Sequence, residues 1–253
     1  MIDYEVKDRV AVITINRPEA RNAVNGEVAK GLEAAVDRVE ADPDVWISIL
    51  TGAGPVFCAG ADLSVIAAGR ASDMFTKRGD FAGFVRRERT KPVIAAVDGP
   101  ALAGGFELAL ACDLVVASTD AQFGLPEVKW SLVAAAGGLV RLPRILPQQV
   151  AMRMLLTGDP IDAETAFQHG LISELVAPGD ALEASLAMAD KISGNAPLAV
   201  RATLRLAHEC ADAGSDVIWA ASRKAMNELA LSEDYKEGPR AFFEKRRPRW
   251  SGQ

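Results

Sequence analysis

Cysteine and histidine are scarce in this chain of 253 residues, which has three cysteines and two histidines. The cysteines, Cys58, Cys112 and Cys210, are far apart and form no ligand spacing typical of a metal site. We therefore expect reduced thiols and no bound metal, as is usual for a protein of the cytoplasm.

Long apolar runs and excess positive charge are also missing. No stretch approaches the roughly 20 apolar residues of a membrane span, and the N-terminus lacks the pattern of a signal peptide. The formal net charge of -6 argues against a nucleic-acid partner. No Gly-x-Gly-x-x-Gly follows the first expected strand, which disfavours a dinucleotide cofactor.

Strands and helices alternate in the first half of the chain, which predicts an α/β fold built of stacked β/α turns. Runs rich in β-branched residues predict the strands, and helical spacing of apolar residues predicts the helices. Residues 67–89 show no clean period and are a candidate for a mobile lid or a covering helix. The expected strands are 10–15, 45–51, 92–97 and 114–117, the helices are 25–39 and 106–111, and residues 121–127 are a loop.

From about residue 147 onward the pattern is mainly helical, apart from a short expected strand at 171–176. We place a soft boundary near residue 195, between a core of residues 1–195 and a helical region of residues 196–253. The expected helices are 148–157, 162–169, 180–193, 198–213 and 217–231, followed by a polar link at 232–238 and a short last helix at 239–246.

One stretch combines a helix start with a single carboxylate. Gly104 and Gly105 open a buried helix, and Glu107 follows one turn later. A helix start offers unpaired N–H groups and the positive end of the helix dipole. A donor beside a carboxylate suits proton chemistry next to a carbonyl group. The alternative is that Glu107 only balances the helix dipole.

A second candidate is the loop at residues 57–63, whose small residues leave backbone N–H groups accessible. If it lies beside Gly104, the amides of Ala61 and Gly104 could form an oxyanion hole, in which one lost donor costs ~3 kcal/mol of transition-state stabilisation. Cys58 has no nearby histidine to activate it, which favours a buried small residue over a nucleophile.

A third candidate is Glu127, which follows Pro126. Such a residue is usually a helix-start or surface carboxylate. Placed across a pocket from Glu107, it would complete a pair in which one carboxylate activates water and the other delivers a proton. Spacing alone does not show that the two meet.

Four short blocks resemble the signature segments of the enoyl-CoA hydratase/isomerase (crotonase) family. They lie in order at residues 16–23, 57–63, 103–109 and 122–127, and the tail at 237–243 matches as well. The resemblance implies a spiral of β-β-α turns with a helical C-terminal trimerisation region. It implies an acyl-CoA thioester substrate, no metal or other cofactor, and a homotrimer or a dimer of trimers.

The resemblance also implies roles for individual residues. It gives the oxyanion hole to the amides of Ala61 and Gly104, and it makes Glu107 and Glu127 the catalytic pair of an enoyl-CoA hydratase, a lyase. The residues that match coenzyme A contacts are Arg21, Ala23, Ala59, Asp62 and Leu63 in the core and Phe242 and Lys245 in the tail, which in some members reach a neighbour's coenzyme A.

The chain departs from the hydratase pattern after Glu127. Hydratases usually carry Gly-x-x-Pro-Gly-x-Gly-Gly there, whereas residues 131–138 read Ser-Leu-Val-Ala-Ala-Ala-Gly-Gly, preceded by Trp130. This segment lines the acyl end of the family's pocket, so the placement of water and the size of the acyl group are open. The alternatives are a double-bond isomerase of the same family and a non-catalytic acyl-CoA-binding member.

Overall fold

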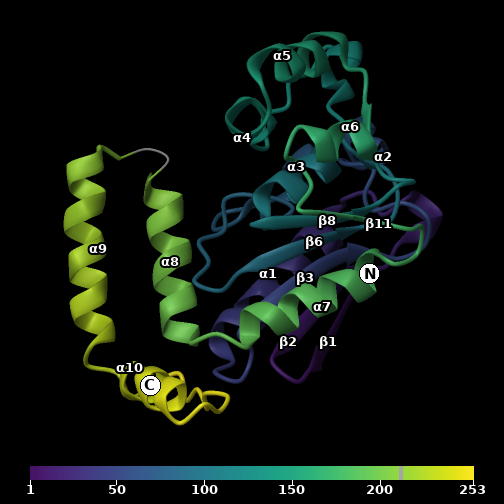
Figure 1. Cartoon of the computed structure of the whole chain (residues 1–253). Coiled ribbons are helices and arrows are strands. Elements are labelled where there is room, and N and C mark those ends of the chain that lie inside the picture. Colours follow the sequence, from purple (N-terminus) through teal and green to yellow (C-terminus); the bar gives the residue numbers. More distant parts are fainter. Residues whose placement is uncertain (211–212) are drawn as a thin grey trace.

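A mostly parallel six-stranded sheet forms the centre of the computed structural model, which describes residues 1–210 and 213–253 (Figure 1). The strand order is β1-β2-β3-β6-β8-β11, in which β1 and β2 form an antiparallel hairpin and the other neighbours are parallel. The α/β class is confirmed. The strands are β1 (Ile2–Lys7), β2 (Val10–Ile15), β3 (Ile47–Gly52), β6 (Val93–Val97), β8 (Leu114–Ser118) and β11 (Glu174–Val176).

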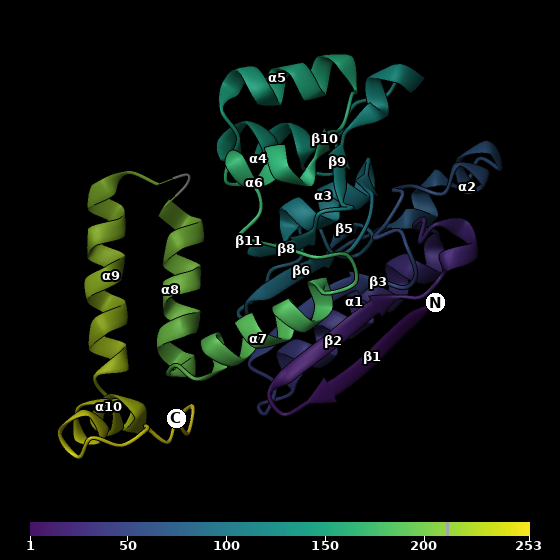
Figure 2. The same ribbon diagram turned by 45° about the vertical axis from the view of Figure 1, so that its right-hand side comes forward.

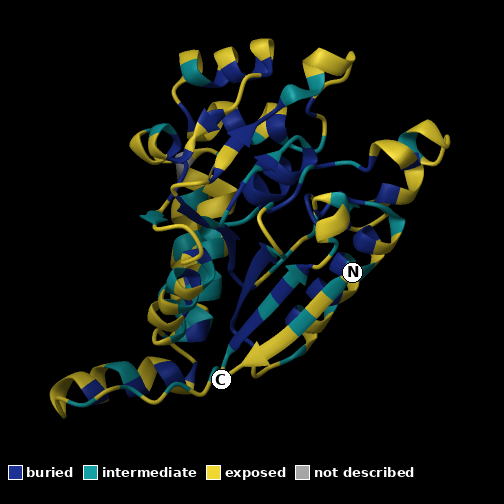
Figure 3. Cartoon of the chain, turned by 90° about the vertical axis from the view of Figure 1, so that its right-hand side faces the viewer, coloured by how far each residue is buried: buried dark blue, intermediate teal, exposed yellow. Residues whose placement is uncertain are grey.

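Helices cover both faces of this sheet, so its inner strands are buried, whereas the edge strand β1 is mostly exposed. Alternate residues of β2 point to opposite sides, so that Ile13 packs with helix α1 (Gly26–Ala41) and Val10 belongs to the cluster under helix α7 (Ala181–Ser193). Parallel strands buried on both faces read as continuous apolar runs, as β6 does with all five of its residues buried. Figure 3 shows the inner strands in dark blue and the edge strand β1, next to the N-terminus, mostly in yellow.

A smaller layer of short elements stands on the carboxyl side of the strands and carries the functional pocket. It contains a three-stranded sheet in the order β10-β9-β7 and a two-stranded hairpin. Its strands are β4 (Phe75–Thr76), β5 (Asp80–Phe81), β7 (Ala101–Leu102), β9 (Gln122–Gly124) and β10 (Ile161–Asp162). Its helices are α2 (Leu63–Ala67), α3 (Gly104–Ala111), α4 (Gly138–Ile145), α5 (Gln148–Thr157) and α6 (Ala163–Gln168), with 3-10 turns η1 (Pro18–Ala20), η2 (Ala71–Met74) and η3 (Pro126–Trp130).

The prediction of a covering helix at residues 67–89 is wrong, and the alternative of a mobile lid stays a prediction. The segment contains η2 and the hairpin of β4 and β5, and Phe81 and Phe84 are buried in the core. Asp80, Ala82 and Gly83 all have positive φ, which no right-handed helix allows. A segment made of short turns has no helical period, which is why its sequence pattern was unclear.

Three other expectations need correction. Residues 121–127 are not simply a loop, because β9 pairs with β7 and β10 there and η3 follows. Helix α4 has no counterpart among the sequence predictions. The last helix, α10 (Glu233–Phe243), begins six residues before Pro239, because the Ser232 side chain caps it by accepting a hydrogen bond from the Tyr235 amide at 3.1 Å.

The C-terminal helices form an arm that leaves the core (Figures 1 and 2). Helices α8 (Pro197–Cys210) and α9 (Ser215–Leu229) run side by side in opposite directions, and α10 lies at the far end of α9. The helix predicted at 198–213 extends past Cys210, the last residue of α8. Its positions 211–212 lie outside the described residues. On α9, Val217, Trp219 and Met226 are exposed, as on a helix that packs against another chain. Trimerisation through residues 196–253 stays a prediction.

Within the described residues, no helix has both the length and the apolar character needed to cross a membrane. Close backbone contacts join the short elements that stand on the sheet, and one of them involves Gly105. A Cβ atom on this glycine would lie 2.0 Å from the Cys58 carbonyl oxygen.

We predict that Gly105→Ala lowers the free energy of unfolding by about 2 kcal/mol or more, because the new methyl group forces main chain apart. Urea unfolding measures this. Gly238→Ala is the matched control, since the nearest atom to its Cβ would be 3.6 Å away and alanine favours the helix interior. Equal losses in the two variants would contradict the predicted clash.

Candidate active site

A pocket of about 300 Å³ lies at the N-terminal end of α3. Four parts of the chain build it: the loop at 57–63, the segment from α2 to β5, the start of α3, and the segment from η3 to residue 136. Residues from all three candidate motifs line it, namely Ala59, Ala61 and Leu63, then Gly104 and Glu107, then Glu127. The fold therefore brings together motifs that are far apart in the sequence.

Hydrogen bonds to both sides fix the loop at 57–63. The Gly60 carbonyl accepts from the Val24 amide at 2.7 Å, and the Asp62 amide donates to the Val24 carbonyl at 2.9 Å. On the other side, the Leu102 amide donates to the Cys58 carbonyl at 3.0 Å. Gly60 has φ +91°, and a Cβ atom there would lie 2.9 Å from the Gly104 nitrogen. Only glycine allows this conformation and this approach at the same time.

The amides of Ala61 and Gly104 are the two candidate donors. Within the described part of the chain neither donates to a backbone or side-chain acceptor, and Gly104 is the first residue of α3, where helical amides lack partners. Ala103, just before it, has φ +50°, a strained value for a residue with a Cβ atom. This strain sits at the peptide bond that carries the Gly104 N–H.

Glu107 is almost fully buried, with 2% of its surface exposed. Its Oε1 atom accepts a hydrogen bond from the Gly138 amide at 2.8 Å. Burial, followed by the charge of Glu127, raises the pKa of Glu107 to about 7, against the opposing effects of the Gly138 hydrogen bond and Arg141. The side chain can therefore either hold or accept a proton near neutral pH.

Glu127 lies on η3 and lines the same pocket. Its Oε2 atom is buried and has no hydrogen-bonding partner among the described residues. Burial raises the pKa of Glu127 as well. Two carboxylates that share a poorly solvated pocket resist double ionisation, which suits them to pass protons at neutral pH.

Both carboxylate oxygens of Asp62 interact with other residues of the protein. Its Oδ2 atom pairs with the Arg17 guanidinium at 2.6 Å, and its Oδ1 atom accepts from the Ser64 amide at 2.9 Å and so caps α2. The Ser64 hydroxyl, more than Arg17, lowers the pKa of Asp62 despite partial burial. Both oxygens are thus occupied by the protein, and Asp62 holds the loop in place beside Leu63.

Arg21 and Ala23 border the loop but are not among the residues that line the pocket. The Arg21 carbonyl accepts from the Ala59 amide at 3.0 Å, and the Ala23 carbonyl accepts from Arg17 at 3.1 Å. Phe242 and Lys245 are at the end of α10, with Phe242 79% exposed, and Figures 1 and 2 show this helix remote from α3. A single chain does not bring these two residues to its own pocket.

Sequence reasoning missed two residues that shape the site. Gly138 supplies the hydrogen bond to Glu107, and a Cβ atom there would lie 3.2 Å from Glu107 Oε1. Phe81 packs on the start of α3, where a Cβ on Gly104 would lie 2.5 Å from its ring. The Gly137-Gly138 pair was a visible signal, whereas Phe81 lay in the segment without a period.

Cys58 is a structural residue. Its thiol donates to the Asn22 carbonyl at 3.1 Å, and burial raises its pKa to about 12, so that the reactive thiolate is not formed at neutral pH. Elsewhere in residues 1–210 and 213–253, no three histidine, cysteine, aspartate or glutamate side chains gather where they could hold a metal ion.

The fold and the pocket define an α/β protein with backbone donors and two acidic side chains around one small apolar site. A family model described as enoyl-CoA hydratase/isomerase matches residues 5–253. The chain therefore belongs to the enoyl-CoA hydratase/isomerase family, and the family resemblance and the crotonase-type fold are confirmed.

Named relatives agree with this membership. Enoyl-CoA hydratase EchA19 of Mycobacterium tuberculosis is 44% identical over 96% of this chain and 94% of its own length. (E)-Benzylidenesuccinyl-CoA hydratase of Thauera aromatica is 41% identical over 99% of both chains. A crystal structure of an enoyl-CoA hydratase from Mycobacterium tuberculosis superposes with a TM-score of 0.96, 48% identity, and coverage of 100% of this chain and 99% of that one.

The raised pKa of Glu107 gives a pH-dependent prediction. Folding opposes ionisation of this side chain, so the stability it contributes is present below pH 4.5 and is lost as pH rises through about 7. We predict that Glu107→Gln gains about 2 to 3 kcal/mol in unfolding free energy relative to the native chain on going from pH 5 to pH 8.

Urea unfolding at both pH values measures this gain. Glu164→Gln, an exposed carboxylate on α6, is the matched control and should show no such change. A pH-independent difference between Glu107→Gln and the native chain would show that Glu107 ionises normally in the folded protein.

Proposed function

We propose that this protein is an enoyl-CoA hydratase, a lyase that reversibly adds water across the 2,3 double bond of an enoyl-CoA thioester. The observation that carries the proposal is the meeting of Glu107 and Glu127 in one buried pocket with the Gly104 amide. The names of the two relatives above, both hydratases of CoA thioesters, support it.

The two backbone amides act on the thioester carbonyl oxygen. As water adds to C3, negative charge develops on this oxygen in an enolate-like state. The amides of Ala61 and Gly104 donate to it, and the dipole of α3 adds to the stabilisation. Because the hydrogen bonds described above fix these amides in advance, little reorganisation is needed during the reaction.

The two glutamates handle the protons. Glu107, held by the Gly138 amide, orients the water and takes its proton as the oxygen bonds to C3. Glu127 delivers its proton to C2. One carboxyl group gains the proton that the other loses, and exchange between them restores the starting state. Dehydration uses the same groups in reverse.

The rest of the substrate contacts the rim of the pocket. We propose that Arg21, Ala23, Ala59, Asp62 and Leu63 border the coenzyme A moiety, with Asp62 acting through the position of its loop. Coenzyme A is part of the substrate, and the chemistry above uses only groups of the protein. We also propose a cytoplasmic location, because the three cysteines are free thiols and the proposed substrate is an acyl-CoA thioester.

We further propose a homotrimer, alone or paired as a dimer of trimers, in which Phe242 and Lys245 reach a neighbour's coenzyme A. The remote position of α10 and the exposed apolar residues of α9 support this assembly. An arm that carried these residues for its own pocket would have to fold back over the core.

Glu107→Gln and Glu127→Gln should each lower kcat for crotonyl-CoA hydration by about 10²- to 10⁴-fold, because each removes a positioned proton-transfer group. Loss of the enoyl absorbance measures the rate. Glu164→Gln again serves as the matched control and should keep native activity. Near-native rates in both active-site variants, with folding verified by circular dichroism, would refute the proposed pair.

The isomerase alternative predicts a different product. With heavy-oxygen water, a hydratase yields a 3-hydroxyacyl-CoA that carries the label, whereas a double-bond isomerase moves the double bond without taking up oxygen. Mass spectrometry of the product therefore separates the two reactions. Tight acyl-CoA binding with neither product would indicate a non-catalytic member.

Sedimentation equilibrium should give a molecular mass three or six times that of one chain. Trp219→Asp, which places a charge on the exposed apolar face of α9, should shift the population toward single chains. Lys224→Asp, at an 80% exposed lysine on the same helix, is the control for a surface charge change. A native chain that sediments as a monomer at all concentrations would rule out the assembly.

A further inference from the structure

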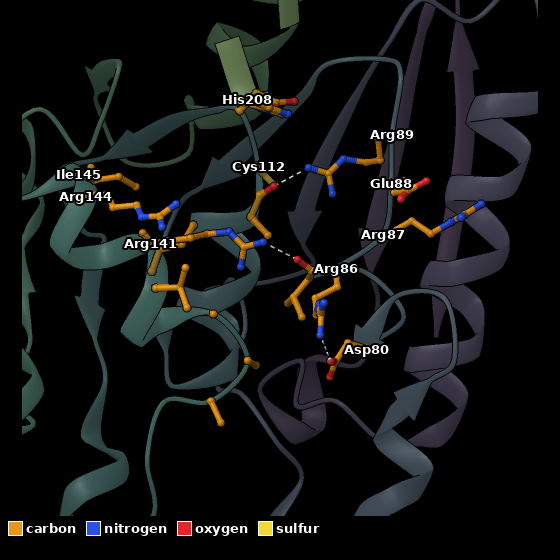
Figure 4. Close-up of a pocket in the computed structure, with 18 of the residues that line it drawn as sticks. Asp80, Arg86, Arg87, Glu88, Arg89, Cys112, Arg141, Arg144, Ile145 and His208 are labelled. Carbon is orange, nitrogen blue, oxygen red and sulfur yellow. Dashed lines mark hydrogen bonds and ion pairs between the residues drawn. The ribbon is translucent and has the colours of Figure 1, made fainter. Parts of the chain in front are cut away.

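A second, larger cavity of about 760 Å³ lies between the core and the arm, and we call it the arginine cleft (Figure 4). Five arginines and one histidine line it, against three acidic residues, Asp80, Glu88 and Asp113. The basic residues are Arg86, Arg87, Arg89, Arg141 and Arg144 from the core and His208 from α8.

Two of these arginines have no carboxylate partner among the described residues. Arg87 pairs with Asp37 at 2.7 Å, and Arg86 lies 3.9 Å from Asp80. Arg89 instead donates to the Ala111 carbonyl and Arg141 to the Val85 carbonyl. Figure 4 draws a dashed line from each of these two labelled guanidinium groups. Each guanidinium has five N–H donors, so both retain donors for another acceptor.

The charges of Arg89 and Arg141 are close and only partly solvated. Burial first, and then the charge of Arg89, lowers the pKa of Arg141, yet a guanidinium remains protonated in proteins. The Nε atom of Arg89 is buried without a partner. Like charges held together in this way are costly unless an anion joins them.

The acidic residues of the cleft do not supply that anion. Asp113 Oδ2 accepts from the Val93 amide at 2.7 Å, and its Oδ1 lies 2.9 Å from His208 Nε2. Asp80 faces Arg86, and Glu88 is exposed to solvent. Arg89 and Arg141 therefore remain available to a carboxylate that comes from outside the chain.

The cleft adjoins the catalytic pocket. Ala135 and Ala136 line both cavities. Helix α3 runs from Gly104 in the pocket to Ala111 in the cleft, a distance of about 10 Å at 1.5 Å per residue, and Glu107 lies between. By contrast, Ala61 and Leu63 line only the pocket.

From this arrangement we propose that the arginine cleft receives a carboxylate at the distal end of the acyl chain. The thioester oxygen lies at Gly104, the reacting carbons beside the two glutamates, and the terminal carboxylate beyond Ala135 and Ala136, between Arg89 and Arg141. An extended carbon chain advances about 1.3 Å per bond, and a hydrogen bond of about 3 Å at each end adds to its reach, so a chain of about six carbons covers this length. The proposal rests on the proposed function and names its substrate class, an enoyl-CoA with an ω-carboxyl group.

The test compares two substrates that differ only at the distal end, 2-hexenoyl-CoA and 2-hexenedioyl-CoA. The native enzyme should have a kcat/KM at least tenfold higher for the dicarboxylic substrate. Arg141→Met should reduce this ratio at least tenfold, and Arg141→Lys, which keeps the charge but loses the planar fork, should retain part of it. The ratio should also fall as ionic strength rises.

Arg153→Met is the matched control, because Arg153 is exposed on α5 and lies outside the residues that line the cleft. It should leave the ratio of the two substrates unchanged. Calorimetry with the saturated ligands adipyl-CoA and hexanoyl-CoA provides a readout that needs no turnover. Adipyl-CoA should bind at least tenfold more tightly to the native protein, and Arg141→Met should remove this difference.

The outcomes separate this inference from the proposed function. Hydration of 2-hexenoyl-CoA with no preference for the dicarboxylic substrate would overturn the inference alone, as would a preference that survives Arg141→Met. Absence of hydration of either substrate would overturn the proposed function, and calorimetry would still decide the carboxylate site. Equal binding of both saturated ligands, with dissociation of the oligomer in Arg141→Met, would show that the cleft holds a carboxylate of a second copy instead.

Discussion

The close approach of residues 57–61 to residues 101–105 is the constraint on which the site depends. The Cys58 carbonyl accepts from Leu102 and lies where a Cβ on Gly105 would stand, so the two segments touch main chain to main chain. A second close approach of main chain lies beside it, where a Cβ atom on Gly60 would be 2.9 Å from the Gly104 nitrogen. Side chains on either glycine would separate Ala61 from Gly104, and with them the two proposed donors.

Helix α3 links the chemistry to the rest of the molecule through both of its ends. Its first amide opens into the catalytic pocket, Glu107 occupies its first turn, and its last carbonyls meet Arg89. A cation at the C-terminus complements the same dipole that favours negative charge at the N-terminus. One short buried helix thus turns the positive end of its dipole toward the pocket and the negative end toward the arginine cleft.

The sequence predicted the elements whose signals are local. The apolar run at 92–97 is β6, the stretch after Gly104 is α3, and Gly158 ends α5 in a left-handed conformation. It failed at residues 67–89, where tertiary packing of Phe81 and Phe84 maintains a chain of turns. Local motifs singled out Glu107 and Glu127, and the family resemblance paired them. The arginine cleft instead joins residues 80–89, 110–113, 135–145 and 207–208, which no local pattern relates.

The ionisation of Glu107 has a consequence for metabolism. A base that is half-protonated near pH 7 works at a rate set by the acidity around it. Under the proposed roles, water addition and water release both need one proton shared by the two carboxyl groups, so a drop in cellular pH that protonates Glu107 as well as Glu127 slows both directions. Flux through this step would then follow the internal pH of the cell directly, without an effector molecule or a modifying enzyme.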